Sequence, residues 1–215
     1  MFAYSFRTGV KRGGLAAAFA LAGCLQSAVA ATNVWVGGGG NVNWSTAANW
    51  TNSVLPVGAE DLVVQLAGNV NLGSLATPLN QDLANPLVLN RLATVDYPSG
   101  DVSVYVGGGA LQFAASGGVQ PTLQHNRENS LYVRTPVILP AGVMLVIGNR
   151  TFGIDFENAI SGEGGLCFMS GSSGGEMTLK NPTNTYSGGT YYNTSAFGTS
   201  VQYTRLFASV NNAFG

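Results

Sequence analysis

The chain has 215 residues, of which 46% are hydrophobic, only 9% are charged and thirty are Gly, and its formal net charge at pH 7 is −1. An average soluble domain has about 25% charged residues and about 7% Gly, so this chain is poor in charge and rich in turn-forming residues. A near-neutral chain lacks the basic surface that binds nucleic acid, and a single His excludes any site built from several imidazoles. We therefore expect no nucleic-acid partner.

The first thirty residues have the features of a secretory signal peptide. Three basic residues precede the uncharged run 15–25, which is shorter than the roughly 20 residues of a membrane span. The small residues Ala28 and Ala30 then favour cleavage before Ala31. We predict that residues 1–30 are a signal peptide and that the protein is exported to the cell surface, the outer membrane or the medium.

A second interpretation uses the same run. The string Leu21-Ala22-Gly23-Cys24 matches the lipobox of bacterial lipoproteins, in which a lipidated Cys24 would anchor the mature chain. In either case Cys167 is the only remaining thiol, so no intrachain disulfide is expected. Because Cys167 lies in an apolar run, we expect it to be a small buried hydrophobic residue.

The mature chain shows short apolar runs bounded by turn residues and no sustained helical period. The run 102–106 alternates, so one face of that strand should be buried, whereas 143–147 is apolar throughout and should be covered on both faces. The strands expected from these runs are 62–66, 87–89, 102–106, 131–133, 143–147, 151–156 and 177–179.

Two all-β architectures fit such strands, a β-solenoid and a β-sandwich. Repeated Asn and Gly favour the solenoid, because both residues suit tight corners and stacked Asn side chains hydrogen-bond along the axis. The low charge favours it too, since like charges repel when coils stack. We expect an N-terminal Trp/Gly-rich cap with the first strands over 31–100 and a parallel β-solenoid over 101–215.

Two segments resemble bacterial proteins that carry autotransporter-associated β-strand repeats. The first contains Trp35, Gly37–Gly40, Trp44 and Trp50 and looks like the N-terminal opening of these proteins. The second, over about 160–192, is similar to the repeat itself. It contains Gly-Gly-Leu, Met-Thr-Leu and Asn-Thr-Tyr-Ser-Gly-Gly-Thr strings, and the repeat residues are Gly164, Gly165, Leu166, Asn184, Tyr186, Gly188, Gly189 and Thr190.

The resemblance implies a right-handed β-helix passenger at the cell surface, with a structural or adhesive role and a repeat that aids folding and export. It implies no chemistry, and we expect no enzyme activity, cofactor or metal. The sequence departs from the repeat pattern at Cys167 and Phe168, where the family has a polar residue and Lys. Only one clear repeat is present, so we expect the chain to be a fragment whose partners include its missing C-terminal part.

Three groups of residues could form a functional site, and each also has a simpler structural explanation. Trp35, Trp44 and Trp50 could stack on sugar rings, but an aromatic cap over the first coil explains them better. Asp155 and Glu157 share one strand face, where paired carboxylates could hydrolyse a glycan or bind Ca²⁺; a solvated face is the simpler explanation.

An enzyme would need a groove with these carboxylates and a basic residue, for which Arg150 is the nearest candidate. The alternative function is therefore a carbohydrate-active or carbohydrate-binding β-helix, with carbohydrate or a host or neighbouring cell surface as partner. His125, near Ser130 and Glu128, has no nucleophile-elbow context and is expected in a loop.

Overall fold

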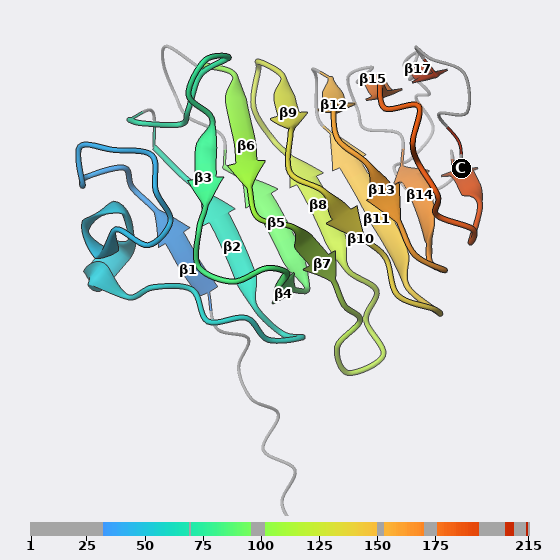
Figure 1. The fold of residues 1–215 in the computed structure, drawn as a ribbon, viewed down its shortest axis with the longest axis horizontal. Helices are drawn as coiled ribbons and strands as arrows, with labels where there is room; N and C mark the ends of the chain where they lie inside the picture. Colours follow the sequence, from blue (N-terminus) through green and yellow to red (C-terminus); the bar gives the residue numbers. More distant parts are fainter. Residues whose placement is uncertain are drawn as a thin grey trace, which may run out of the picture.

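The structure is a computed structural model that describes residues 32–68, 70–95, 102–149, 153–169, 176–193, 205–208 and 214. Its strands form three sheets, which we call A, B and C (Figure 1). Sheet A contains β1 (Thr32–Trp35), β2 (Val63–Leu66), β5 (Arg91–Thr94), β8 (Thr122–His125), β11 (Met144–Asn149), β14 (Gly165–Met169) and β16 (Thr190–Asn193). Sheet B contains β3 (Leu79–Gln81), β6 (Val104–Gly108), β9 (Leu131–Val133), β12 (Ile154–Phe156), β15 (Glu176–Leu179) and β17 (Arg205–Ala208). Sheet C contains β4 (Leu87–Leu89), β7 (Leu111–Phe113), β10 (Val137–Ile138) and β13 (Ile160–Ser161).

The chain visits the three sheets in the order A, B, C and then begins again one level further along. Four successive segments, β2–β4, β5–β7, β8–β10 and β11–β13, each supply one strand to every sheet. Every ladder between these strands is parallel. The protein is therefore a parallel β-solenoid of about four turns, and the antiparallel β-sandwich is wrong.

The register stacks apolar side chains along the axis of the solenoid. In sheet A one inward column runs through Val64, Leu92, Leu123, Ile147 and Phe168, all buried. The alternation of buried and half-buried residues along each strand follows from the two-residue period of β structure. The buried side chains form one continuous cluster from the first coil to the last, so neighbouring coils stabilise one another.

A cap closes the N-terminal end of the stack. Residues 36–62 contain two short 3₁₀ turns, η1 (Ala47–Asn49) and η2 (Thr51–Ser53), and lie beside β1 (Figure 1). The backbone of this segment also pairs with β3: Trp44 N–H donates to Asn80 O at 2.9 Å, and Asn80 N–H donates to Val42 O at 2.8 Å. The segment thereby satisfies the outer edge of β3, which would otherwise expose unpaired backbone groups.

Two expectations about the strands need correction, and one is confirmed. The sheets run without interruption past residue 100, where β5 pairs with β8, so the strands before and after it belong to one solenoid. The run 143–147 is not covered on both faces: Leu145 and Ile147 are buried, while Met144 and Val146 are only half-buried on the outer face. The run 102–106 does alternate as expected, with Val104 and Val106 buried.

No helix in the described part of the chain combines the length and apolar character that a membrane span requires. The proposed signal peptide and Cys24 lie outside the described residues.

Candidate functional site

The repeat motif at Asn184–Thr190 forms a corner that lies along the coil below it. Thr185 N–H donates to Ile160 O at 2.9 Å, Ser187 N–H to Gly162 O at 3.0 Å and Gly188 N–H to Gly164 O at 2.9 Å. The segment therefore continues the stacking of sheet C and then leads directly into β16. The motif is thus a corner between two sheets of the solenoid.

Two side chains of this motif, those of Asn184 and Tyr186, are buried and bond to other groups of the protein. Asn184 Oδ1 accepts the Ile160 N–H at 2.8 Å, so the side chain takes a position that a strand carbonyl would occupy in the ladder. This bond joins the corner to the neighbouring coil. Tyr186 is 2% exposed and belongs to the core cluster, and its hydroxyl lies 2.6 Å from Thr190 Oγ1. Burial raises the pKa of Tyr186 and outweighs the opposite effect of this hydrogen bond.

The glycines of the motif allow two coils to approach closely. A Cβ at Gly188 would lie 2.5 Å from the carbonyl carbon of Gly164 and 2.6 Å from the nitrogen of Gly165. Gly189 has φ +82°, which L-residues with side chains rarely adopt. The neighbouring Leu166 is fully buried in the core. These geometries are those of a packed corner: Asn184 and Tyr186 are buried, while Thr185 and Ser187 are exposed to solvent.

The three tryptophans are buried at the N-terminal end of the solenoid, Trp35 at the end of β1 and the other two in the cap. Trp35, Trp44 and Trp50 are at most 2% exposed. Trp50 meets Trp35 edge-to-face at 5.2 Å between ring centroids and Trp44 at 5.5 Å, and its Nε1–H donates to Trp44 O at 2.7 Å. Sugar stacking needs an open ring face, which these buried rings do not offer, so the cap interpretation fits and the sugar-stacking interpretation does not.

The outer face of sheet B carries a ladder of aromatic and charged side chains. Tyr105, Tyr132 and Asp155 are in register on β6, β9 and β12, and the two tyrosine rings stack at 4.5 Å with an interplanar angle of 6°. Beside them, Arg134 donates through Nε to Glu157 at 2.7 Å. The guanidinium of Arg134 also lies 5.3 Å from the centre of the Tyr105 ring.

Lys180 completes this ladder. Its Nζ lies 2.7 Å from Asp155 Oδ2, 3.5 Å from Glu157 Oε1 and 5.7 Å from the centre of the Tyr132 ring. Burial lowers the pKa of Lys180, but the hydrogen bond to Asp155 and the attraction of both carboxylates outweigh it and raise the pKa above its usual value. The face is thus a network of paired charges rather than a set of separate solvated groups.

Asp155 and Glu157 lie on the same face of the sheet, as their spacing predicts, and basic side chains converge on the two carboxylates. These come from Arg134 and Lys180 on neighbouring coils, whereas Arg150 lies outside the described residues. Because each carboxylate is paired with a cation and the tyrosine faces contact other groups, the arrangement resembles a structural ladder more than a catalytic groove.

His125 is not in a loop. It ends β8 with a fully buried side chain, and its Nδ1 lies 2.8 Å from Thr94 Oγ1, while Nε2 contacts Asn129 O. Because a carbonyl only accepts hydrogen bonds, Nε2 donates to Asn129 O. His125 therefore fills the interior at the end of β8. In the described residues no group of three or more His, Cys, Asp or Glu side chains is placed to hold a metal ion.

We find no significant match of this chain to a protein-family model, to a curated protein or to a solved structure. The likeness to autotransporter-associated repeats therefore rests on the sequence strings alone.

Proposed function

We propose that this chain is a segment of an exported β-solenoid passenger with a structural or adhesive role at the bacterial surface. The observation that carries the proposal is the single apolar interior that runs through all the stacked coils. A solenoid of this kind is an elongated scaffold: each coil contacts its neighbours, and the outer faces are left to hold side chains toward solvent.

The repeat motif supports the family part of the proposal. The strings that resemble the autotransporter-associated repeat coincide with β14, β15 and the corner at 184–190, where close packing and a positive φ require glycine. Export is supported by the signal-like residues 1–30. In this proposal the repeat helps the last coils to fold as the chain reaches the surface.

Expression of the full chain in a bacterium with an outer membrane tests the proposal. The N-terminus of the exported protein should be Ala31, or a lipidated Cys24, as read by mass spectrometry. Leu21→Arg, which interrupts the apolar run, should leave the chain in the cytoplasm. An unprocessed chain that starts at Met1 and stays in the cytoplasm would contradict export.

A second candidate function is carbohydrate binding or cleavage on the outer face of sheet B. It is favoured by one observation, the convergence of Asp155, Glu157 and Lys180 within 3.5 Å. Binding and depolymerisation assays on a panel of acidic and neutral polysaccharides would test it. Loss of a measured activity in Asp155→Asn and Glu157→Gln, with folding retained, would support this function over the structural one.

A further inference from the structure

Gly148 is a glycine that the fold itself does not require. It lies within β11, where its partners in register are Gln124 on β8 and Met169 on β14. Among the glycines of the described ranges, it is the one that has neither a positive φ nor any atom within 4 Å of the position that a Cβ would take. Glycine within a strand is destabilising relative to Ala, and it often marks a place where a ligand or another backbone approaches closely.

A depression of about 170 Å³ lies over Gly148 on the outer face of sheet A. The described residues that line it carry no charge; they are Thr122, Leu123, Gln124, Val146, Gly148 and Met169. Arg91 Nη2 donates to Gln124 Oε1. Because a guanidinium only donates, this bond fixes the amide oxygen of Gln124 toward Arg91 and leaves the amide N–H₂ group as a donor. The depression thus combines apolar walls with a hydroxyl and an amide that can hydrogen-bond a ligand.

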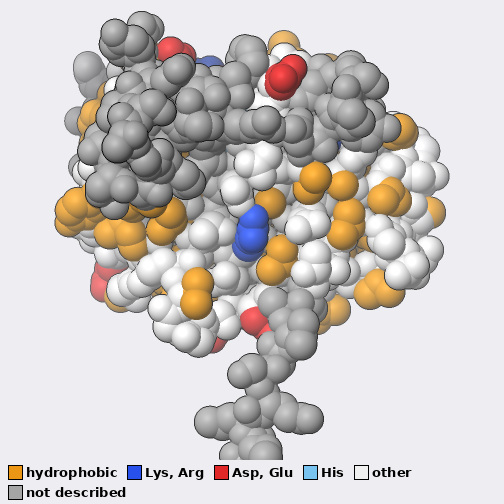
Figure 2. All heavy atoms as spheres, turned by 180° about the vertical axis from the view of Figure 1, so that it is seen from behind, with side chains coloured by type: hydrophobic (Ala, Val, Ile, Leu, Met, Phe, Trp, Pro, Cys, Tyr) orange, Lys and Arg blue, Asp and Glu red, His pale blue; other side chains and the backbone are white. Residues whose placement is uncertain are grey.

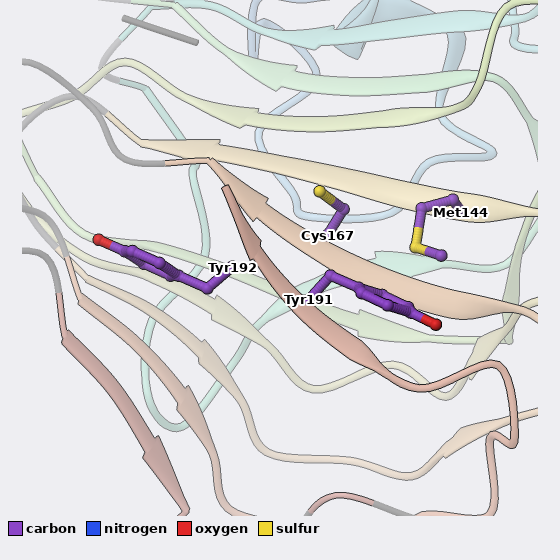
Figure 3. A pocket seen from close by; sticks show the side chains of 4 residues that line it. All are labelled: Met144, Cys167, Tyr191 and Tyr192. Atoms are coloured by element: carbon purple, nitrogen blue, oxygen red, sulfur yellow. The ribbon is translucent and has the colours of Figure 1, made fainter. Parts of the chain in front are cut away.

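A second depression, on the same face, contains an exposed aromatic ring. It has a volume of about 360 Å³ and is lined by Met144, Cys167, Tyr191 and Tyr192. Tyr191 is 55% exposed, and a Cβ at Gly189 would lie 3.3 Å from its ring, so the ring lies close over this glycine. Figure 3 shows Met144, Cys167 and Tyr191 gathered over neighbouring strands, while Tyr192 points away from them. Tyr191 therefore has the open ring surface that the buried tryptophans lack.

The two depressions are far enough apart to need an extended ligand. Met144 and Gly148 are four residues apart on β11, so they point to the same side and lie about 13 Å apart along the strand. Seen from behind, the molecule has many hydrophobic and few charged side chains (Figure 2). Cys167 is half-buried on the outer face of sheet A, which corrects the expectation of a residue buried in the core. A ligand that reaches both depressions must be a chain with apolar and hydrogen-bonding surfaces.

We propose that the outer face of sheet A binds a neutral oligosaccharide, with one sugar ring in the depression over Gly148 and another against the ring of Tyr191. Sugar rings have apolar C–H faces, which suit the tyrosine ring and the apolar walls, and hydroxyl groups, which suit Thr122 and Gln124. The uncharged lining favours a neutral sugar over an acidic one.

The main-chain pairing favours a saccharide over an extended peptide. Such peptides bind at a sheet edge, through the free backbone groups of an edge strand. Here β11 lies between β8 and β14, and β14 lies between β11 and β16, so the backbone groups under the depressions are already paired. As the contact made by an adhesive passenger, the site rests on the proposed function and names the chemistry of its partner.

Isothermal titration calorimetry of the purified full chain tests the site. At least one of cellohexaose, maltohexaose, mannohexaose and chitohexaose should bind, and more tightly than the acidic hexagalacturonate. Gly148→Leu fills the first depression and Tyr191→Ala removes the ring from the second; each should weaken binding about tenfold or more, as loss of a central contact does. Tyr191→Phe keeps the ring and should bind like the unaltered chain. Phe207→Ala removes an exposed ring from the outer face of sheet B and should leave the affinity unchanged.

The melting temperature of each variant is followed by circular dichroism, and Gly148→Leu should retain it because the space over Gly148 is open. The site is wrong if none of the four neutral oligosaccharides binds, or if hexagalacturonate binds most tightly. It is also wrong if Gly148→Leu and Tyr191→Ala bind like the unaltered chain while Asp155→Asn loses binding, which would assign the sugar to sheet B.

Two further measurements separate the remaining explanations. Analytical ultracentrifugation tests for another backbone over Gly148: a dimer of the unaltered chain that becomes a monomer in Gly148→Leu would overturn the saccharide site. The calorimetry does not depend on export, so the two proposals can fail separately. A chain that binds sugar but stays in the cytoplasm contradicts the proposed function, and an exported chain that binds no sugar contradicts this site alone.

Discussion

Gly188 and Gly189 are required at the repeat corner for two different physical reasons. At Gly189 the reason is the backbone, since φ is +82°. At Gly188 it is space, since any Cβ would lie 2.5 Å from the coil below. Of the two, only Gly189 has a positive φ; the close approach at Gly188 depends on how the coils stack and leaves no local signal in the sequence.

Replacing either glycine should therefore destabilise the protein. We expect Gly189→Val to lower the free energy of unfolding by about 1–3 kcal/mol through backbone strain. Gly188→Val should cost at least as much, because the clash is with backbone that cannot move aside. Gly148→Ala is the control: it lies on a strand with nothing within 4 Å of its would-be Cβ, and should be neutral. Urea denaturation measures all three, and an unchanged midpoint in both valine variants would contradict the packing argument.

Lys180 should give the protein a pH-dependent contribution to stability. Its pKa is raised in the folded state, so the stabilisation is fully present below the unfolded pKa of about 10.4 and is lost as pH rises through the folded value. Because the side chain is 37% exposed, solvent screening keeps the effect below about 1 kcal/mol.

Urea midpoints of the unaltered chain and Lys180→Met should accordingly differ at pH 7 and converge once the pH exceeds the raised pKa of Lys180 in the folded state. Lys180→Arg is the matched control, because a guanidinium stays charged at that pH and should retain the ion pairs. A difference that persists unchanged at high pH would show that Lys180 acts through packing of its methylene groups.

At the scale of strands, the sequence predicted those whose own residues alternate or are strongly apolar. The expected 87–89 and 131–133 match β4 and β9 in full. It missed short strands such as β3, Leu79–Gln81, whose centre is Asn. Such a strand has too few residues to show a period, and it forms because the coils on either side fix its register.

The outer ladder of sheet B was predicted only in part for the same reason. That Asp155 and Glu157 share a face follows from their spacing. Their partners Arg134 and Lys180 come from adjacent coils, so their proximity depends on coil length. One signal was available: Arg134, Glu157 and Lys180 are separated by 23 residues each, close to one coil, and alternate in charge.

The side chain of Asn184 links the corner at 184–190 to β13, so removing this side chain should weaken the stacking on sheet C. Asn184→Ala leaves the buried Ile160 N–H without its acceptor, which should cost about 1–3 kcal/mol. The control Thr185→Ala changes an exposed side chain and should stay within about 0.5 kcal/mol. Thermal and urea denaturation measure both variants, and an Asn184→Ala loss no larger than that of Thr185→Ala would contradict the role of the oxygen.

For the whole molecule, the apolar interior predicts that the cap and the coils unfold together. Trp44 and Trp50 lie in the cap and Trp35 ends β1 beside it, so fluorescence reports the N-terminal end of the solenoid, whereas far-UV circular dichroism reports every sheet. Since the Trp rings and the strands of the last coils belong to one cluster, the urea midpoints of the two signals should coincide.

A variant in the cap tests whether the two midpoints coincide because the cap and the coils unfold together. Trp50→Ala removes a ring that contacts both other tryptophans and should cost about 3–5 kcal/mol, as truncation of buried aromatic residues does. If the stack is cooperative, this loss lowers the midpoint of both signals equally, although most strands are far from Trp50. Val57→Ala, at a residue 78% exposed in the same cap, should move neither signal. The contrary result is a fluorescence midpoint that falls while the circular dichroism midpoint stays. It would mean that the cap folds separately from the coils, because coupling between neighbouring coils decays along the axis.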